Sequence, residues 1–552
     1  RIEDENGNLV DEVDYLPEGD WPNLADGDGS SMELRHPSMN NNISSAWDDS
    51  DESNKSTMQK FTYTGNFDRS YWLPLRNGQE LHTHLVGDSH VILENISVTL
   101  NNSGSNLLRN PAVMSQSSAS SQGWVCQGTH YQSFFDGRKL NLISTGHGDN
   151  KGNRAEVDFA TSPVFDQSYT LSFDGRWVSG KSRIIFQTLD HGFGTTFLLP
   201  IPNNLGTPGA ANSTLLAAPA PTVTGVIHSP VVPKPGNPVT VTSRIESAGP
   251  LTSVTLVHRL DSNSGDETWR RTTMTDQGGG VYSATVSQNT STNQITQFYV
   301  EATSGNTTTT QPKFGAERPA MWIVDSREMP NILLQERFIV SNYDRQALNS
   351  NIGGGPTFNY NFPRQSNQFF NATFIANESE IYYNAEIRKS GSPFTRATDA
   401  NIDHGKWKLP RDRLFRGRRR SVIDASGTPQ GSGTPRFYDD RIARYFLYQL
   451  GHPVNEMEYT HTVINNGRFN LRESHEPISN DFLKRNFKNG SKGTLLRIDD
   501  EWRFTSDDGN ARQSRNADWA YKDTGNPVAY HSEWLMRTRE SDYDYGNFIE
   551  LT

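Results

Sequence analysis

The chain has 552 residues, a formal net charge of −11 and a mean hydropathy of −0.70. The acidic balance excludes a chain built as a whole to bind nucleic acid, and no apolar run approaches the roughly 20 residues that a membrane-spanning helix needs. Only 33% of the residues are hydrophobic and 45 are glycine, which favours several loop-rich β-domains over helical bundles. The single cysteine, Cys126, forms no disulfide within the chain and is expected to be a small buried residue.

Residues 1–56 begin with the hairpin signal Asn6-Gly7, after which apolar and polar residues alternate as in a half-buried strand. Trp21-Pro22, a Gly-rich turn and Trp47 follow in order. This order resembles the C-terminal half of a bacterial lamin-tail domain, an immunoglobulin-like β-sandwich. The usual first strands of that domain are missing, so the resemblance implies that the chain is a piece of a larger protein.

Residues 57–212 contain many short strands between clusters of Gly, Asn and Ser. The runs 91–100 and 168–177 are among the predicted strands. The pattern resembles a galactose-binding-type jelly roll, which is the double-sheet sandwich of many carbohydrate-binding modules. The resemblance implies that this region binds glycans.

Two polar loops carry candidate calcium ligands, since carboxylate and amide oxygens are the donors that calcium prefers. Asp26 and Asp28 lie in the Gly-rich turn, and Asp149 and Asn150 lie in a loop that is also suited to a sugar. A plain turn and a solvated loop explain the same residues, so both alternatives stay open.

A candidate zinc set lies in the strand region that begins near residue 81. His82 and His84 share one face of a strand, and Asp88 and His90 follow closely. Imidazole and carboxylate groups are zinc ligands. The spacing matches no known zinc motif, so ordinary buried histidines are the competing interpretation.

Residues 213–327 are predicted to form a further sandwich, entered through a Pro- and Ala-rich linker near 204–224. Strand-like runs at 239–246 and 253–260 precede a Gly-rich turn and a strand that resemble those of a fibronectin-type-III or immunoglobulin-like domain. No residue here suggests chemistry, so the module is expected to act as a spacer or a contact surface.

Charge is distributed unevenly between the two ends of the chain. Residues 1–55 carry 15 acidic and 3 basic side chains, whereas residues 388–420 carry 11 basic and 3 acidic ones. A solvated surface explains the acidic segment, and a solvated loop explains the basic run 416–420. Contact of that run with an anion or an acidic partner is the alternative, and nucleic acid is the least favoured partner.

The segment from residue 381 onward is the part of the sequence that suggests chemistry. Residues 381–388 are predicted to form a buried strand, followed by a small Ser-Gly-Ser turn and by cationic residues, a combination that can hold a phosphate group. Further on, residues 439–450 are predicted to form a helix that ends at Gly451. Its buried face is predicted to consist of Ile442, Tyr445, Phe446 and Leu450.

Residues 328–552 resemble the spore-coat-protein-H-like (CotH) kinase family, with the family's motifs in the same order. Arg388-Lys-Ser-Gly-Ser392 matches its strand and turn, and Lys406-Trp-Lys408 matches its lysine strand. The resemblance implies an α+β kinase-like fold that uses ATP with Mg²⁺ or Mn²⁺ to phosphorylate proteins outside the cytoplasm. Glu473 is implied to orient Lys406 or Lys408. The residues implied to bind the cofactor are Arg388, Ser390, Gly391, Ser392, Lys406, Lys408, Glu473 and Arg497.

One departure from the family limits this interpretation. The family's catalytic base and metal-binding aspartates lie beyond the motifs matched here, and residues 474–552 hold no convincing equivalent. Either the catalytic half follows residue 552 in a longer chain or the domain has lost catalysis, so this chain alone is not expected to be an active kinase.

The sequence thus predicts a multi-domain, mostly β protein made of Ig-like sandwiches and a jelly roll, with a C-terminal α+β kinase-like domain over 328–552. Its predicted function is that of an extracellular or cell-surface protein with a structural or adhesive role. The alternative is a secreted protein kinase that acts on Ser and Thr of surface proteins and whose catalytic half lies beyond residue 552. Other surface proteins or glycans are the expected partners, and self-association into a larger assembly is a further option.

Overall fold

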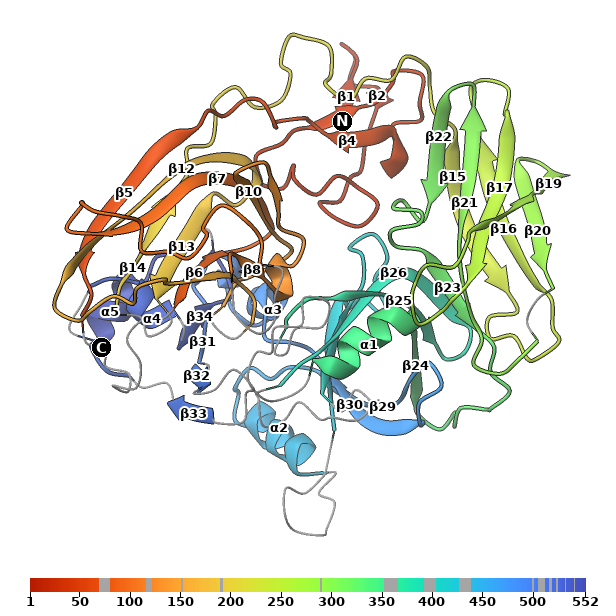
Figure 1. The fold of residues 1–552 in the computed structure, drawn as a ribbon. Helices are drawn as coiled ribbons and strands as arrows, with labels where there is room; N and C mark the ends of the chain where they lie inside the picture. The colour runs from red at the N-terminus through yellow and green to blue at the C-terminus, as the bar shows by residue number, and fades with distance from the viewer. Residues whose placement is uncertain are drawn as a thin grey trace.

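The fold is described by a computed structural model. It covers residues 1–68, 80–115, 122–149, 152–188, 192–287, 290–351, 366–391, 404–425, 438–498, 501–504, 512–515, 519–522, 525–531, 533–540 and 542–552. The chain is mostly β, as predicted, and runs through an N-terminal segment, two sandwiches, a closed barrel and a C-terminal layer (Figure 1). No helix within these ranges is both long enough and apolar enough to cross a membrane.

The first sandwich follows the N-terminal segment. Its strands are β5 (Gln59–Asn66), β6 (Glu80–Leu85), β7 (Ser89–Leu100), β8 (Val125–Cys126), β9 (Phe134–Asp136), β10 (Lys139–Ser144), β11 (Ala155–Asp158), β12 (Ser168–Gly180), β13 (Arg183–Thr188) and β14 (Gly194–Leu198). They form two five-stranded sheets with the orders β5-β12-β7-β10-β9 and β14-β13-β6-β11-β8. This arrangement is consistent with the predicted jelly roll.

Alternation along the strands creates one core between these two sheets. In β7 the buried residues Val91 and Leu93 alternate with partly exposed ones, and Trp177 of β12 and Phe186 of β13 pack in the same cluster. Cys126 is buried there, as predicted, and burial raises the pKa of its thiol to about 12. The thiol is therefore protonated at neutral pH and a poor nucleophile.

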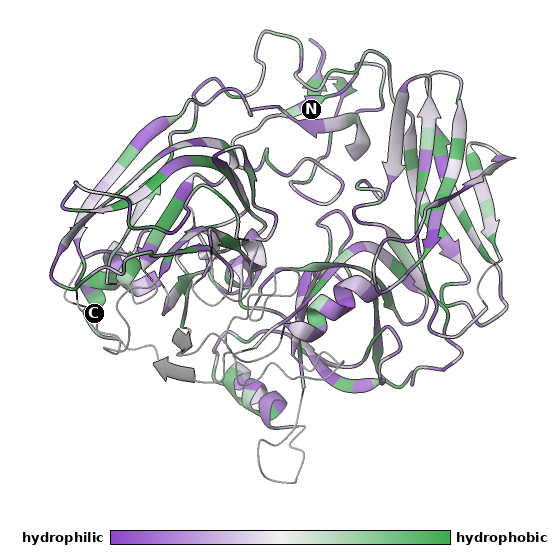
Figure 2. Ribbon diagram, viewed as in Figure 1, coloured by the Kyte–Doolittle hydropathy of each residue, from purple (hydrophilic) through white to green (hydrophobic). Residues whose placement is uncertain are grey.

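The second sandwich has strands β15 (Thr222–Ser229), β16 (Val239–Glu246), β17 (Ser253–Leu260), β18 (Arg270–Thr273), β19 (Thr275–Gly278), β20 (Val281–Val286), β21 (Ile295–Ser304), β22 (Thr307–Gln311) and β23 (Ala320–Ile323). One sheet has the order β15-β16-β20-β19 and the other β18-β17-β21-β22, with β23 also paired to β21. Hydrophobic and hydrophilic residues alternate along these strands (Figure 2), as expected when one face of each sheet is buried.

The barrel is built from β24 (Leu334–Ile339), β25 (Phe370–Ala376), β26 (Glu380–Lys389), β27 (Gly405–Lys408), β28 (Arg420–Asp424), β29 (Met457–Ile464) and β30 (Asn470–His475). It closes in the order β24-β25-β26-β27-β28-β30-β29, and β29 returns parallel to β24. Phe338, Phe374 and Trp407 fill its interior. Closure pairs every strand on both sides, which removes exposed sheet edges.

The second sandwich and the barrel share one hydrophobic cluster. Trp322 of β23 lies in this cluster together with Ile375, Ile381 and Tyr383 of the barrel. The Tyr383 hydroxyl lies 2.6 Å from Nδ1 of the buried His228 on β15. The two units are therefore joined by a packed and hydrogen-bonded interface.

The elements after the barrel are α3 (Asn480–Asn486), β31 (Leu496–Ile498), β32 (Glu501–Phe504), β33 (Arg512–Arg515), α4 (Val528–His531), β34 (Trp534–Met536) and α5 (Gly546–Leu551). Of these, β31, α4, β34 and α5 form a thin layer on the first sandwich. Tyr530, Trp534 and Phe548 form one cluster with Val86 and Ile185 of the first sandwich. Residues 328–552 therefore combine the barrel with a layer that covers another module, and a kinase-like fold for this region stays a prediction.

The two remaining helices flank the barrel. The helix α1 (Asn342–Ser350) is capped by the Ser341 side chain, which accepts a hydrogen bond from the Asp344 backbone at 3.0 Å. The helix α2 (Asp439–Gln449) forms where it was predicted.

The predicted buried face of α2 is wrong. Its apolar residues are exposed, with Tyr445 at 60% and Leu450 at 73%. The polar side of the helix faces the barrel instead, because Arg441 lies 5.4 Å from the ring centre of Tyr459 and Arg444 bonds to Asn455.

The N-terminal segment has two small sheets, β1 (Ile2–Glu3) with β2 (Leu9–Asp11) and β3 (Met32–Leu34) with β4 (Trp47–Asp49). The acidic segment was predicted to be a solvated surface, but some of its acidic side chains make ion pairs or are buried. Glu18 pairs with Arg411 at 3.3 Å and also with Arg419, so the acidic and basic segments of the chain meet. Glu33, which is 4% exposed, accepts hydrogen bonds from Thr207 and Ser213.

Candidate functional site

The residues predicted to bind phosphate fall on the neighbouring strands β26 and β27. Arg388 lies directly opposite Lys406, and Glu386 lies opposite Lys408. The Ser390 backbone donates to the His404 carbonyl at 2.9 Å, which ties the turn to the start of β27. Gly391 has a φ of 103°, a conformation that favours glycine. Ser392 lies outside the described residues.

Lys408 has a carboxylate partner on the adjacent strand. Its Nζ lies 2.5 Å from Oε2 of Glu386 and 4.8 Å from the ring centre of Phe369. Glu386 also pairs with Arg318 at 2.9 Å. Burial lowers the pKa of Lys408 to about 8, and Asp88 opposes that shift. The ion pair of Lys408 is thus made with Glu386 and not with Glu473.

Arg388 belongs to a chain of hydrogen bonds that joins the barrel to the first sandwich. Its Nη1 donates to Asn367 Oδ1 at 2.8 Å, and Asn367 Nδ2 donates to Asp149 Oδ2 at 3.0 Å. Asn153 donates to both oxygens of Asp149 at 2.9 Å. Two residues predicted from distant parts of the sequence, for phosphate and for calcium, therefore meet through Asn367, which sequence reasoning did not single out.

The predicted calcium ligands face other partners in this structure. Asp28 pairs with Lys181 Nζ at 2.5 Å, whereas Asp26 is exposed. Amide donors surround Asp149, and Asn150 lies outside the described residues. A calcium ion at either loop would have to compete with these donors, and it stays a prediction.

Glu473 lies two strands away from Lys406, on β30. It is 3% exposed, and burial, followed by Asp440 and Asp424, raises its pKa to about 7. Its cross-strand neighbour Asp424 lies 2.6 Å from His404 Nδ1. Burial alone would raise the pKa of Asp424, but the hydrogen bonds from His404 and His475 lower it.

Arg497 lies apart from the other predicted residues. It is an exposed residue of β31, which pairs with β34 and not with a barrel strand. Leu496 next to it packs against the cluster that covers the first sandwich. The resemblance grouped Arg497 with the other cofactor-binding residues, but sequence order alone does not show which module a strand joins.

The predicted zinc set is not assembled. His90 bonds to Asn141 at 3.0 Å on the other sheet of the sandwich. Burial raises the pKa of Asp88, and the positive charge of Lys408 opposes that shift. His84 faces the C-terminal layer, where its ring lies 5.3 Å from that of His531. Strand alternation placed His82 and His84 on one face correctly, but the turn between β6 and β7 carries His90 to a different sheet.

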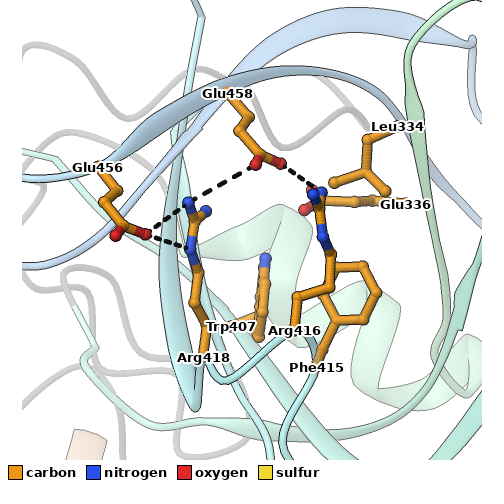
Figure 3. Close-up of a pocket in the computed structure, with 8 residues that line it drawn as sticks. All are labelled: Leu334, Glu336, Trp407, Phe415, Arg416, Arg418, Glu456 and Glu458. Atoms are coloured by element: carbon orange, nitrogen blue, oxygen red, sulfur yellow. Dashed lines mark hydrogen bonds and ion pairs between the residues drawn. The ribbon is translucent and has the colours of Figure 1, made fainter.

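A small pocket opens at one end of the barrel and was not found from the sequence (Figure 3). Its volume is about 160 Å³. On its wall, Arg418 pairs with Glu456 at 3.1 Å, and Arg416 pairs with Glu458 at 2.9 Å. The full lining is Leu334, Glu336, Trp407, Phe415, Arg416, Arg418, Glu456 and Glu458.

Glu336 is the buried acid of this pocket. It is 1% exposed and accepts hydrogen bonds from Ser474 at 2.9 Å and from Thr462 at 3.4 Å. Burial raises its pKa to about 7, although both hydrogen bonds act in the opposite direction. Such a carboxyl group exchanges its proton near neutral pH. In the sequence, a charged residue at an inward-facing position of the strand β24 was the feature that could have indicated this buried acid.

Buried histidines line the contact between the first sandwich and the C-terminal layer. His84 is fully buried, and burial, followed by the charges of His531 and His130, lowers its pKa well below the usual value. Burial lowers the pKa of His130 to about 3, and its Nε2 accepts the Leu85 backbone N–H at 3.0 Å. The pKa of His147 is raised because its bond to Glu540 outweighs burial.

These shifts predict that acid weakens the fold. Histidines held neutral in the folded state bind fewer protons than in the unfolded state, so stability falls as the pH drops below about 6.5. For His130, whose pKa is lowered to about 3, we expect a loss of about 2 kcal/mol between pH 6.5 and pH 5, and His84 acts in the same direction. His147, whose pKa is raised, acts in the opposite direction.

The matched variants are His84→Asn and His452→Asn, the second at an exposed position. Denaturant unfolding near pH 7 and pH 5 should show a smaller acid loss in His84→Asn and the wild-type loss in His452→Asn. Equal losses in both variants would contradict the role of His84.

Comparisons with known proteins give no family. No protein-family model and no curated protein matches the chain. Among solved structures, the pullulanase from Bacillus acidopullulyticus is similar at 11% sequence identity and a TM-score of 0.11, over 44% of this chain and 34% of that one. The alignment thus spans about a third of that structure, and so low a TM-score supports no conclusion about function.

Proposed function

We propose that this chain is an extracytoplasmic modular protein with a structural or adhesive role at a cell surface. In this proposal the N-terminal segment derives from a lamin-tail domain, the first sandwich is a jelly roll of the carbohydrate-binding type and the second is Ig-like. The barrel and the residues after it belong to a CotH-like kinase fold that serves as a scaffold.

The observation that carries the scaffold role is the engagement of the candidate phosphate ligands in contacts between modules. Arg388 bonds through Asn367 to Asp149 of the first sandwich. Lys408 and Arg318 share the carboxylate of Glu386. A phosphate group would have to break partly buried, charge-assisted bonds to recruit these cations, which disfavours nucleotide binding.

The second candidate is a secreted kinase whose catalytic half lies beyond residue 552. It is favoured by the placement of Arg388 opposite Lys406, beside the turn that contains Ser390 and Gly391. Phosphoryl transfer needs cations and backbone N–H groups at the phosphates. ATP with Mg²⁺ or Mn²⁺ would be the cofactor of this candidate.

Calorimetric titration of the full chain with ATP and Mg²⁺ or Mn²⁺ separates the two candidates. The scaffold proposal predicts no measurable heat and no shift of the melting temperature at millimolar ATP. Micromolar binding that Lys406→Met abolishes and Lys139→Met preserves would overturn it in favour of the kinase. Lys139 is the matched control because it is an exposed lysine on β10 of the first sandwich.

The adhesive role has its own test. Labelled full chain on a glycan array is expected to bind a restricted set of glycans, since the first sandwich is proposed to be a carbohydrate-binding jelly roll. A blank array would remove glycans as partners and leave protein surfaces as the contact.

A further inference from the structure

The outer face of the first sandwich carries a buried group of titratable residues. Leu81 and Val157 point into the core, so alternation places Glu80, His82 and Glu156 on the opposite face of the sheet. His82 of β6 lies directly opposite Glu156 of β11. The exposed fractions of His82 and Glu156 are 0% and 1%, and carboxylates are rarely buried to this extent unless they are paired.

The three side chains converge on one small volume. His82 Nε2 lies 2.9 Å from Glu80 Oε2 and 3.8 Å from Glu156 Oε2. One nitrogen and two carboxylate oxygens all lie within 4.8 Å of one another. Ligand atoms around a metal with bonds of about 2.0–2.2 Å are separated by roughly 3–3.5 Å, so small side-chain adjustments suffice to bind an ion.

A second observation concerns the free oxygen of Glu156. Arg154 approaches only Oε2, at 2.6 Å from both Nε and Nη2. The other oxygen, Oε1, is buried and has no hydrogen-bond partner in the described part of the chain. A buried carboxylate oxygen without a partner is costly, so this atom points to a ligand. Burial also raises the pKa of Glu156, as expected for a carboxylate short of positive charge.

We propose that Glu80, His82 and Glu156 form a binding site for a divalent transition-metal ion, and that zinc is the ion that fits best. Mixed imidazole and carboxylate ligands suit zinc, whereas calcium prefers a shell made only of oxygens. Arg154 fixes the Glu156 carboxylate through Oε2 and leaves Oε1 without a hydrogen bond, so a small rotation of the carboxylate can offer either oxygen to the metal. Three protein ligands leave a fourth tetrahedral position, which a water molecule fills.

The full-length chain, without an affinity tag and stripped with EDTA, is the material for the test. After incubation with Zn²⁺ and desalting, elemental analysis is expected to find about one zinc per chain, and Zn²⁺ should raise the melting temperature. Glu156→Gln and Glu80→Gln should each weaken zinc binding by about 100-fold or more, since even loss of a supporting residue around a metal costs 10–100-fold.

Matched controls separate this site from other histidines. His90→Gln removes a half-buried imidazole from the other sheet, and His84→Gln removes one from the buried histidine contact; both should retain the zinc. Glu80 is partly exposed at the start of β6, so its variant should fold, which the melting temperature without metal will verify. The proposal is overturned if the wild type holds no zinc, or if His84→Gln loses it while Glu80→Gln keeps it.

Discussion

Replacing Asp325 by alanine is expected to lower the free energy of unfolding by about 3–5 kcal/mol. Asp325 accepts hydrogen bonds from Arg337 at 3.0 Å and from Arg327 at 2.8 Å, and both side chains of the Asp325–Arg337 pair are 0% exposed. Burial alone would raise the pKa of Asp325, but these bonds lower it, so the carboxylate is charged when folded. Without it, Glu378 is the one carboxylate partner that the buried Arg337 guanidinium retains among the described residues.

Equilibrium unfolding in urea measures this effect. The control is Glu246→Ala, which breaks the exposed pair with Arg244 at 2.9 Å and should change stability by less than about 1 kcal/mol. Similar losses of the free energy of unfolding in the two variants would show that the buried ion pair contributes no more to stability than the exposed one.

Trp322→Ala is expected to cost about 3–5 kcal/mol and to uncouple the second sandwich from the barrel. Trp322 is fully buried, and its ring centre lies 4.9 Å from that of Phe298 and 5.7 Å from that of His228. The same cluster includes Ile375 and Tyr383 of the barrel. Removing the indole therefore leaves a cavity where the two units meet.

Calorimetry of the full chain should show the second sandwich and the barrel melting together in the wild type and in two steps in Trp322→Ala. Tyr445→Ala, which removes an aromatic ring that is 60% exposed on α2, is the control and should change stability by less than about 0.5 kcal/mol. A single unchanged transition in Trp322→Ala would refute the shared core.

Local patterns in the sequence predicted the elements well. The strand expected at 381–388 is β26, and the helix expected at 439–450 is α2. These elements follow from alternation, helical periodicity and the stop at Gly451, all of which act within a few residues. The mostly β class followed from composition and from the density of turn residues.

Long-range placement could not be predicted from the same patterns. The apolar spacing of α2 implied burial, but Arg441 and Arg444 make the contacts with the barrel. Strand β31 carries Arg497 away from the barrel because it pairs with β34. Nothing in the sequence indicated that Arg388 and Asp149 are linked, because the link is made by Asn367, which bonds to both. Such pairings depend on tertiary contacts that no local propensity encodes.

The path of the acidic N-terminal segment has a consequence for biosynthesis. The Asp20 backbone N–H donates to the carboxylate of Asp412, 392 residues further along, and Glu18 pairs with Arg411 and Arg419. A ribosome adding about 5–20 residues per second needs roughly 20–80 seconds between the two segments. The nascent acidic segment waits for that time without its basic partners, and its surplus of negative charge keeps it hydrated until they emerge.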